Sequence, residues 1–215
     1  MRTVYGRATS SNVQMVMWAL AELGLEAERL DYGHAHGGLD APEFAALNPH
    51  RKIPVLRDGD LIIWESSAIL RYLAARYGDG GVFWPADPVA RARVDMWAEW
   101  GKAELVRGFT HPIFRPLIRT TPQDRDTGAI TASLARFEGL LETLGAHLAD
   151  QDHVCGAAFT AADIVIGHVL YRWFTMEIAR RPNPAVEAYY ARLTARPAYR
   201  DHVMVSYEPL RAKGA

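Results

Sequence analysis

The sequence lacks several features that would place a protein outside the cell or in a membrane. Its 215 residues include a single cysteine, Cys155, so no disulfide can form within the chain. A single cysteine is typical of proteins in a reducing compartment. No stretch approaches the roughly 18 apolar residues of a membrane span, and the first residues lack the apolar core of a signal peptide. We therefore expect a cytoplasmic protein without a membrane partner.

The sequence also lacks an excess of charge of one sign. Its formal net charge is -1, which gives no electrostatic reason to expect nucleic acid or an anionic surface as a partner. About half of the residues (49%) are apolar, so a disordered chain is excluded. The chain contains no glycine-rich phosphate loop, no serine nucleophile elbow and no pair of cysteines in a redox motif.

What the sequence does contain is, first, a pattern of short strands and helices over residues 1–78. Apolar residues predict strands at 4–5, 27–31, 55–56 and 61–64, and helical spacing predicts helices over 13–23, 42–47 and 66–77. The order is β-α-β followed by β-β-α. This order predicts a small α/β domain with a mixed sheet.

The remainder of the chain predicts helices only. Residues 79–87 are rich in Gly, Pro and Asp and are expected to form a linker before an all-α domain at 88–215. A helix should begin at Pro88 and end near Pro112 or Pro116. Further helices should begin at a capping box after Thr121 and at a second one after Thr160. Two more should begin near 184 and 197.

Ser10 stands where the first strand meets the first helix, a position where open α/β sheets bind small ligands. The N–H groups and dipole of a helix N-terminus favour an anion, and a hydroxyl can donate a hydrogen bond to it. A thiolate would fit. Lowering a thiol pKa by two units needs about 2.7 kcal/mol. The alternative is that Ser10 and Ser11 only cap the helix, and Ser11 and Thr9 compete for any role of the hydroxyl.

A second group of polar residues surrounds the Ile53-Pro54 bond and the start of the helix at 66. A cis bond before Pro54 would leave the backbone of Ile53 open to an extended ligand, and Lys52 could bind a carboxylate. Glu65 and Ser66 together match an α-amino acid head group, since a carboxylate binds its ammonium and a helix N-terminus binds its carboxylate. The alternatives are a trans proline, a solvated lysine and two ordinary capping residues.

A metal site is not predicted. His34 and His36 are two residues apart in a glycine-rich loop, and no third ligand stands near them.

These stretches, in this order, resemble those of the soluble glutathione transferases over nearly the whole chain. Residues 5–13 are similar to the active-site turn of the serine-type theta and zeta-like bacterial members, and residues 48–54 to the loop before the family's cis-proline. Residues 65–70 resemble the helix that holds the γ-glutamyl end of glutathione, and residues 159–164 the capping box of the helical domain.

The resemblance implies a thioredoxin-like α/β domain followed by an all-α domain that contributes the electrophile pocket. It implies that Ser10 donates to the glutathione thiolate and that Ile53 pairs with the cysteinyl backbone. Lys52 would reach the glycyl end, and Glu65 with Ser66 would hold the γ-glutamyl head group. No metal is implied.

The resemblance also implies a homodimer and a role for the helix that contains Glu104 and Arg107. These two residues have the spacing of an acidic residue and an arginine that serve the site in theta-type members, although Glu104 falls one place off the family register. The implied activity is attack of the glutathione thiolate on a small hydrophobic electrophile. The alternatives are a binding or regulatory protein on the same fold, and a glutathione-dependent isomerase or dehalogenase.

Overall fold

The computed structural model describes residues 1–212 and begins with a four-stranded mixed sheet. The strand order is β2-β1-β3-β4, formed by β1 (Arg2–Tyr5), β2 (Ala27–Leu30), β3 (Val55–Asp58) and β4 (Leu61–Trp64). β1 pairs in parallel with β2 and antiparallel with β3, and β3 and β4 form a hairpin. The predicted β-α-β and β-β-α order is confirmed.

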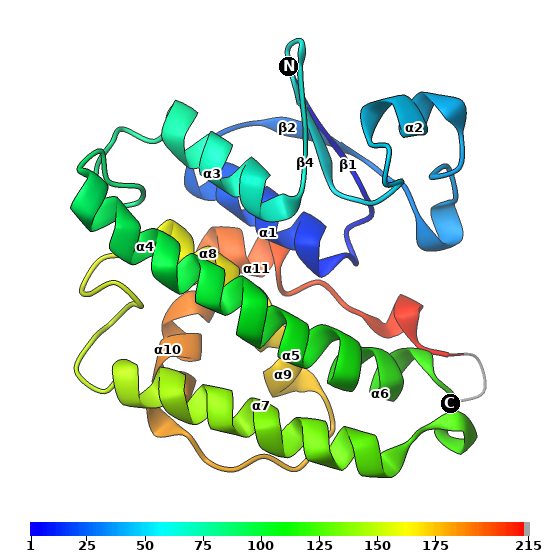
Figure 1. Cartoon of the computed structure of the whole chain (residues 1–215), viewed down its shortest axis with the longest axis vertical. Helices are drawn as coiled ribbons and strands as arrows, with labels where there is room; N and C mark the ends of the chain where they lie inside the picture. The colour runs from blue at the N-terminus through cyan, green and yellow to red at the C-terminus, as the bar shows by residue number, and fades with distance from the viewer. Residues whose placement is uncertain (213–215) are drawn as a thin grey trace.

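Three helices belong to this sheet, and one of them joins the two halves of the molecule. α1 (Ser11–Glu22) and α3 (Ser66–Tyr77) pack together, and α2 (Pro42–Leu47) lies on the other side of the sheet (Figure 1). Trp18 of α1 is fully buried, and its ring lies 4.8 Å from that of Tyr199 and 5.6 Å from that of Phe159. A single apolar core therefore extends from the sheet into the helical domain.

The connection from α3 to the helical domain runs over residues 78–87. α4 (Pro88–Trp100) begins at the predicted position, with the Asp87 carboxylate accepting from the backbone N–H of Ala90 at 2.7 Å. We propose that the boundary between the domains lies in this connection.

The predicted end of this helix near Pro112 was wrong, whereas the alternative end near Pro116 lies three residues before the observed end at Arg119. The helical path continues through η2 (Gly101–Val106), α5 (Arg107–Phe109), η3 (Thr110–Phe114) and α6 (Arg115–Arg119), where η2 and η3 are π-helical. A proline normally breaks an α-helix because it lacks an N–H and its ring meets a carbonyl of the previous turn. Pro112 lies in the π segment η3, and Pro116 is the second residue of α6, which follows η3. The wider turn of the π segment relieves this conflict.

The helix predicted after Thr121 begins five residues later than expected. Thr121 precedes only a short 3-10 turn, η4 (Pro122–Asp124), because its hydroxyl bonds the Asp124 carboxylate at 2.6 Å instead of a backbone N–H. α7 (Thr127–His147) uses Asp126 as its cap.

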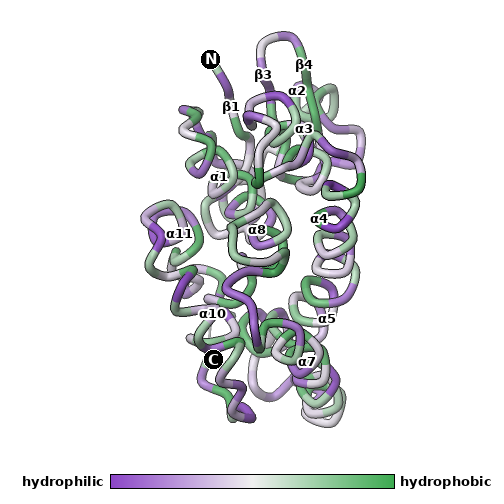
Figure 2. Tube along the Cα trace, turned by 90° about the vertical axis from the view of Figure 1, so that its left-hand side faces the viewer, coloured by the Kyte–Doolittle hydropathy of each residue, from purple (hydrophilic) through white to green (hydrophobic). Residues whose placement is uncertain are grey.

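The remaining helices surround a buried central one. α8 (Ala161–Gly167) is buried along its whole length and lies between α4 and α11 in Figure 2. It begins at the predicted capping box of Thr160 and Asp163, which is confirmed. The others are α9 (Leu170–Thr175), α10 (Pro184–Thr194), α11 (Pro197–His202) and η5 (Glu208–Leu210).

Candidate functional site

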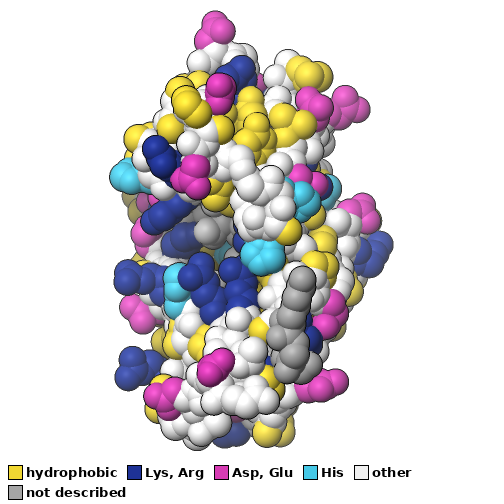
Figure 3. Space-filling model, turned by 90° about the vertical axis from the view of Figure 1, so that its right-hand side faces the viewer, with side chains coloured by type: hydrophobic (Ala, Val, Ile, Leu, Met, Phe, Trp, Pro, Cys, Tyr) yellow, Lys and Arg dark blue, Asp and Glu magenta, His cyan; other side chains and the backbone are white. Residues whose placement is uncertain are grey.

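A cleft of about 550 Å³ lies where the sheet domain meets the helical domain. That volume is in the range of small-molecule sites. Figure 3 shows this face, with Lys and Arg side chains gathered in the hollowed band across its middle. Of the residues predicted from the sequence, the cleft is lined by Ser10, Lys52, Ile53, Glu65 and Arg107. Tertiary structure thus brings together segments that lie up to about a hundred residues apart.

Ser10 is the N-cap residue of α1, but its side chain does not cap the helix. Its φ and ψ of -88° and 121° are those of an N-cap, whereas no hydrogen bond joins its hydroxyl to the first turn. The hydroxyl is therefore available at the cleft. Ser11 and Thr9 line the same wall, so the structure keeps all three hydroxyls beside one another.

The Ile53-Pro54 peptide bond is cis. No backbone hydrogen bond joins the N–H or C=O of Ile53 to another residue in the range 1–212, and Ile53 precedes the first paired residue of β3, Val55. The adjacent Lys52 carbonyl is held by the side chain of Asn48 at 2.8 Å. The free backbone groups of Ile53 form a short open edge at the cleft.

Glu65 and Ser66 form the N-terminus of α3. Glu65 has a left-handed φ of +69° and makes no side-chain cap, and the first helical bond is donated by Ile69 to the Glu65 carbonyl. The N–H groups of the first turn are consequently free for an anion. Ser66 is buried and its hydroxyl faces the helical domain rather than open solvent.

Lys102, which sequence reasoning missed, connects these elements. Its Nζ donates to the Ser66 hydroxyl at 3.0 Å and to Asn12 Oδ1 at 2.9 Å, and the residue lines the cleft. Burial lowers the pKa of Lys102, and the carboxylate of Glu65 opposes that shift. Its partners are 36 and 90 residues away in the chain, so local sequence carried no signal for this role.

Of Glu104 and Arg107, the pair predicted from the long helix, only one lies at the cleft. Arg107 lines the cleft, whereas Glu104 is exposed and is not among the lining residues. The structure therefore places Arg107, but not Glu104, at the cleft.

The electrostatics of the cleft are dominated by positive charge. Its lining contains eight Lys or Arg side chains and one carboxylate, that of Glu65. Arg172 is buried, and desolvation together with the charges of Arg119 and Arg7 lowers its pKa to about 9. It therefore keeps its charge at neutral pH.

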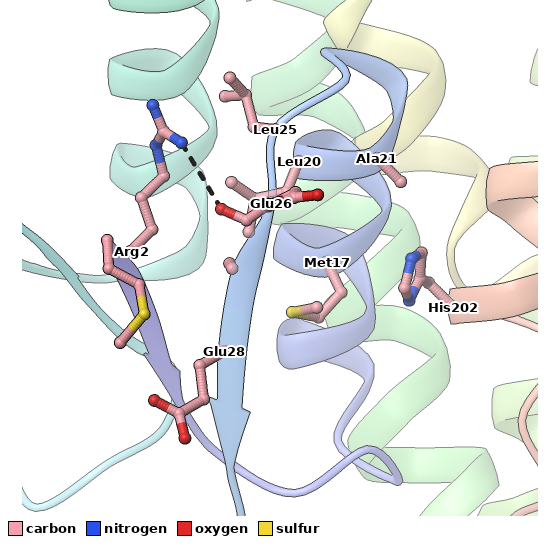
Figure 4. A pocket seen from close by; sticks show the side chains of 10 residues that line it. Arg2, Met17, Leu20, Ala21, Leu25, Glu26, Glu28 and His202 are labelled. Carbon is pink, nitrogen blue, oxygen red and sulfur yellow. Dashed lines mark hydrogen bonds between the residues drawn. The ribbon is translucent and has the colours of Figure 1, made fainter.

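A second hollow, of about 740 Å³, lies outside the cleft between the β1–β2 edge and α1 (Figure 4). Arg2, Glu26 and His202 stand around it, and Arg2 Nη1 donates to the Glu26 carbonyl at 3.5 Å. It contains none of the residues predicted to carry chemistry. The cleft at Ser10 is the better candidate despite its smaller volume.

Within residues 1–212, no group of three or more His, Cys, Asp or Glu side chains is arranged to hold a metal ion. In the same range no helix combines the length and the apolar character needed to cross a bilayer.

Comparison with known families assigns the chain. The sequence model of the glutathione S-transferase N-terminal domain matches residues 2–75, and that of the C-terminal domain matches residues 127–192. The chain belongs to the glutathione S-transferase family.

Individual members of the family support the assignment over nearly the full length. Glutathione S-transferase GstB of Escherichia coli (strain K12) is 38% identical over 207 residues, which cover 95% of this chain and 99% of that protein. Glutathione S-transferase 3 of Zea mays is 31% identical over 93% of this chain and 92% of its own.

A solved structure of the family matches the fold closely. The theta class glutathione S-transferase of Xanthomonas axonopodis pv. citri, solved with glutathione bound, superimposes with a TM-score of 0.90 and 40% identity. The match covers 95% of this chain and 98% of that one. The thioredoxin-like first domain and helical second domain implied by the sequence are thereby confirmed.

Proposed function

We propose that the protein is a glutathione transferase that activates the thiolate of glutathione for attack on a small, largely apolar electrophile. The observation that carries this proposal is the shared cleft. It combines a hydroxyl free of its helix at Ser10, an open backbone edge at Ile53 and the N-terminus of α3 at Glu65, behind which Ser66 is buried against Lys102. These are the three kinds of group that a tripeptide thiol with an amino acid head would engage.

The head group of glutathione would bind at α3. The Glu65 carboxylate would hold the α-ammonium, while the Ser66 hydroxyl, the free N–H groups of the first turn and Lys102 would hold the α-carboxylate. The cysteinyl backbone would pair with Ile53, and Lys52 would approach the glycyl carboxylate. Lys102 already donates to Ser66, so this anion site is partly organised before a ligand binds.

The thiol would lie at the N-terminus of α1. There the Ser10 hydroxyl and the helix dipole favour the thiolate, and the proton is lost to water when glutathione binds. The thiolate then attacks the electrophilic carbon, and the leaving group departs with its electron pair. Proximity and stabilisation of the thiolate supply the catalysis. Thr9 and Ser11 compete with Ser10 for this role because they line the same wall.

We also propose that the protein acts in the cytoplasm as a homodimer. The single cysteine supports a reducing location. The exposed apolar residues of β4, Leu61 and Ile62, support an interface between two copies.

The first experiment is calorimetric titration of the purified protein with reduced glutathione, beside Ser66→Ala and Ser10→Ala. We expect micromolar to low-millimolar binding. Ser66→Ala should weaken it several-fold because an anion contact is lost. Ser10→Ala should leave affinity nearly intact but raise the thiol pKa of the bound ligand, read as thiolate absorbance against pH. Ser11→Ala is the matched control.

The alternative, a binding or regulatory protein on the same fold, predicts a different result. If the folded protein gives no heat at millimolar glutathione, the transferase proposal fails and the alternative stands. A shift in thiol pKa with Ser11→Ala rather than Ser10→Ala would move the role to Ser11. A glutathione-dependent isomerase or dehalogenase would share this thiolate and differ in its electrophile.

A further inference from the structure

A row of basic side chains follows the helical wall of the cleft. Arg107, His111, Arg115 and Arg119 recur at intervals of four residues along α5, η3 and α6, and all four line the cleft. Spacing of four places side chains on one side of a helix, where like charges repel one another. A protein that needed only an apolar pocket would gain nothing from such a row.

Two further arginines approach from other elements. Arg7 extends from the loop between β1 and α1, and Arg172 comes from α9. Arg172 is only 3% exposed. The central carbon of its guanidinium lies 4.4 Å from the centre of the Phe114 ring. Its Nη2 donates to the Thr9 carbonyl at 2.9 Å and to Gln14 Oε1 at 3.3 Å, whereas its Nε has no partner within residues 1–212.

None of the five arginines forms an ion pair with a carboxylate within residues 1–212. After burial, mutual repulsion is the next cause that lowers the pKa of Arg7 and of Arg119. Arg172 is buried and Arg7 and Arg119 are half-buried, and charges in such positions are normally paired because desolvation is costly. An unpaired group of guanidinium ions facing one cavity is chemically complementary to an oxyanion.

We propose that the electrophile taken by this cleft carries an oxyanion, most simply a carboxylate, which the arginine cluster (Arg7, Arg107, Arg115, Arg119 and Arg172) binds. Its apolar body would lie against the apolar part of the lining, which includes Leu39, Val106 and Phe114. The inference rests on the proposed transferase function, and it names the substrate class of the same cleft.

The reaction can be written for a carboxylated aryl chloride. The glutathione thiolate attacks the ring carbon that bears chlorine and forms a C–S bond. The C–Cl bond then breaks, and chloride leaves with the bonding electrons. The carboxylate remains unchanged through the step and serves only to hold the ring beside the thiolate.

The test compares two electrophiles of nearly the same shape, 4-chloro-3-nitrobenzoate and 4-chloro-3-nitrobenzamide. For each, kcat/KM is divided by the rate constant of its own uncatalysed reaction with glutathione, which removes the difference in intrinsic reactivity. We expect this enhancement to be at least about tenfold larger for the benzoate, as a charged hydrogen bond implies. An equal or larger enhancement for the benzamide would overturn the inference and leave the transferase function standing.

Arginine variants test which side chains bind the carboxylate of the benzoate. Arg115 is exposed and Arg119 is half-buried, so Arg115→Gln and Arg119→Gln are less disruptive than a change at buried Arg172. Each should raise the KM for the benzoate about tenfold and reduce its preference over the benzamide. Arg136→Gln, an exposed arginine on α7 outside the cleft, should leave the preference unchanged.

Glutathione is itself anionic, so its own KM is measured with both electrophiles. If Arg115→Gln and Arg119→Gln raise the KM for glutathione and leave the benzoate preference intact, the arginines bind glutathione and the inference is overturned. If neither electrophile reacts and calorimetry detects no glutathione binding, the transferase proposal fails and this inference fails with it.

Discussion

Glu65 combines a local conformational cost with a position at the cleft. Its φ of +69° lies in a region that non-glycine residues rarely adopt, at a typical cost of order 1–3 kcal/mol. The side chain makes no cap hydrogen bond that would offset that cost. We therefore attribute this unfavourable conformation to the proposed role of the Glu65 side chain in binding glutathione rather than to the fold.

Glu65→Gly should therefore raise the stability of the protein and lower its affinity for glutathione. Relief of the positive φ should outweigh the extra freedom of glycine in the unfolded state and raise the free energy of unfolding by about 1 kcal/mol. Glutathione affinity should fall about tenfold. Urea denaturation and calorimetry measure the two effects. Glu65→Gln is the control, since it keeps the backbone conformation and should lose affinity without gaining stability. A loss of stability in Glu65→Gly would contradict this account of the backbone.

His168 makes stability depend on pH in a defined window. The ring is fully buried, and Nδ1 donates to the Val165 carbonyl at 2.8 Å. Burial, with a smaller effect of Lys102, lowers its pKa to about 3. Below its usual pKa near 6.5 the unfolded chain takes up a proton that the folded protein does not. Stability should therefore fall as pH drops from 6.5 towards 3, by about 2 kcal/mol between pH 7 and pH 5.

The variant His168→Asn tests this contribution. Its amide retains a donor but does not titrate, so the difference in unfolding free energy between pH 7 and pH 5 should shrink by about 2 kcal/mol. Urea denaturation at both pH values gives the comparison, with the exposed His50→Asn as control. An undiminished pH dependence in His168→Asn would assign the effect to other groups.

At the scale of elements, the start of α8 depends on one buried carboxylate. Asp163 Oδ2 accepts from the backbone N–H of Thr160 at 2.7 Å and from its hydroxyl at 2.9 Å. Oδ1 accepts from the backbone N–H of Val154 and from the Tyr189 hydroxyl, both at 2.9 Å. The residue thus ties the helix cap to the preceding loop and to α10.

Asp163→Ala should destabilise the protein by at least about 3 kcal/mol, because several buried donors would lose a charged acceptor at once. The matched control is Asp126→Ala. Asp126 caps α7 with a single bond to the N–H of Ala129 at 2.9 Å in an exposed position, and its loss should cost about 1 kcal/mol. Urea denaturation compares them, and equal losses would refute the special role of the buried cap.

At the scale of the whole molecule, two elements that flank α3 carry apolar side chains that are exposed to solvent. Ile62 of β4 is 37% exposed and Met96 of α4 is 60% exposed. β4 contacts α3 directly, and Arg71 of α3 bonds Asp95 of α4 at 2.8 Å. This side of the molecule is the surface on which we place the proposed dimer contact.

Light scattering after size exclusion should therefore give twice the chain mass of 24.0 kDa. Ile62→Glu combined with Met96→Glu should give the monomer, because burying two carboxylates in an apolar contact is unfavourable. Val82→Glu, in the connection 78–87, changes an equally exposed apolar residue and should leave the dimer intact. A dimer that survives the double substitution would place the interface elsewhere.

Local sequence determined the elements and the family of this protein. Alternation, helical spacing and caps depend on residues within one or two turns, so the order of strands and helices along the chain and the box at Thr160 and Asp163 were predictable. The motifs at Ser10, Ile53 and Glu65 also led to the family, since each is a short contiguous stretch. The sequence left open whether the helix passes Pro112, because the rule for proline concerns α-helical turns and the chain forms π turns there.

Only the tertiary structure decided what these stretches build together. Lys102 is held in position by hydrogen bonds to Asn12 and Ser66, which lie on the other side of the domain interface. The spacing of the arginines from Arg107 to Arg119 is visible in the sequence. Arg172 lies in the same cleft only because the helical domain packs against α1. The charge density in a cavity depends on the distances between side chains in space, and folding of the core sets those distances.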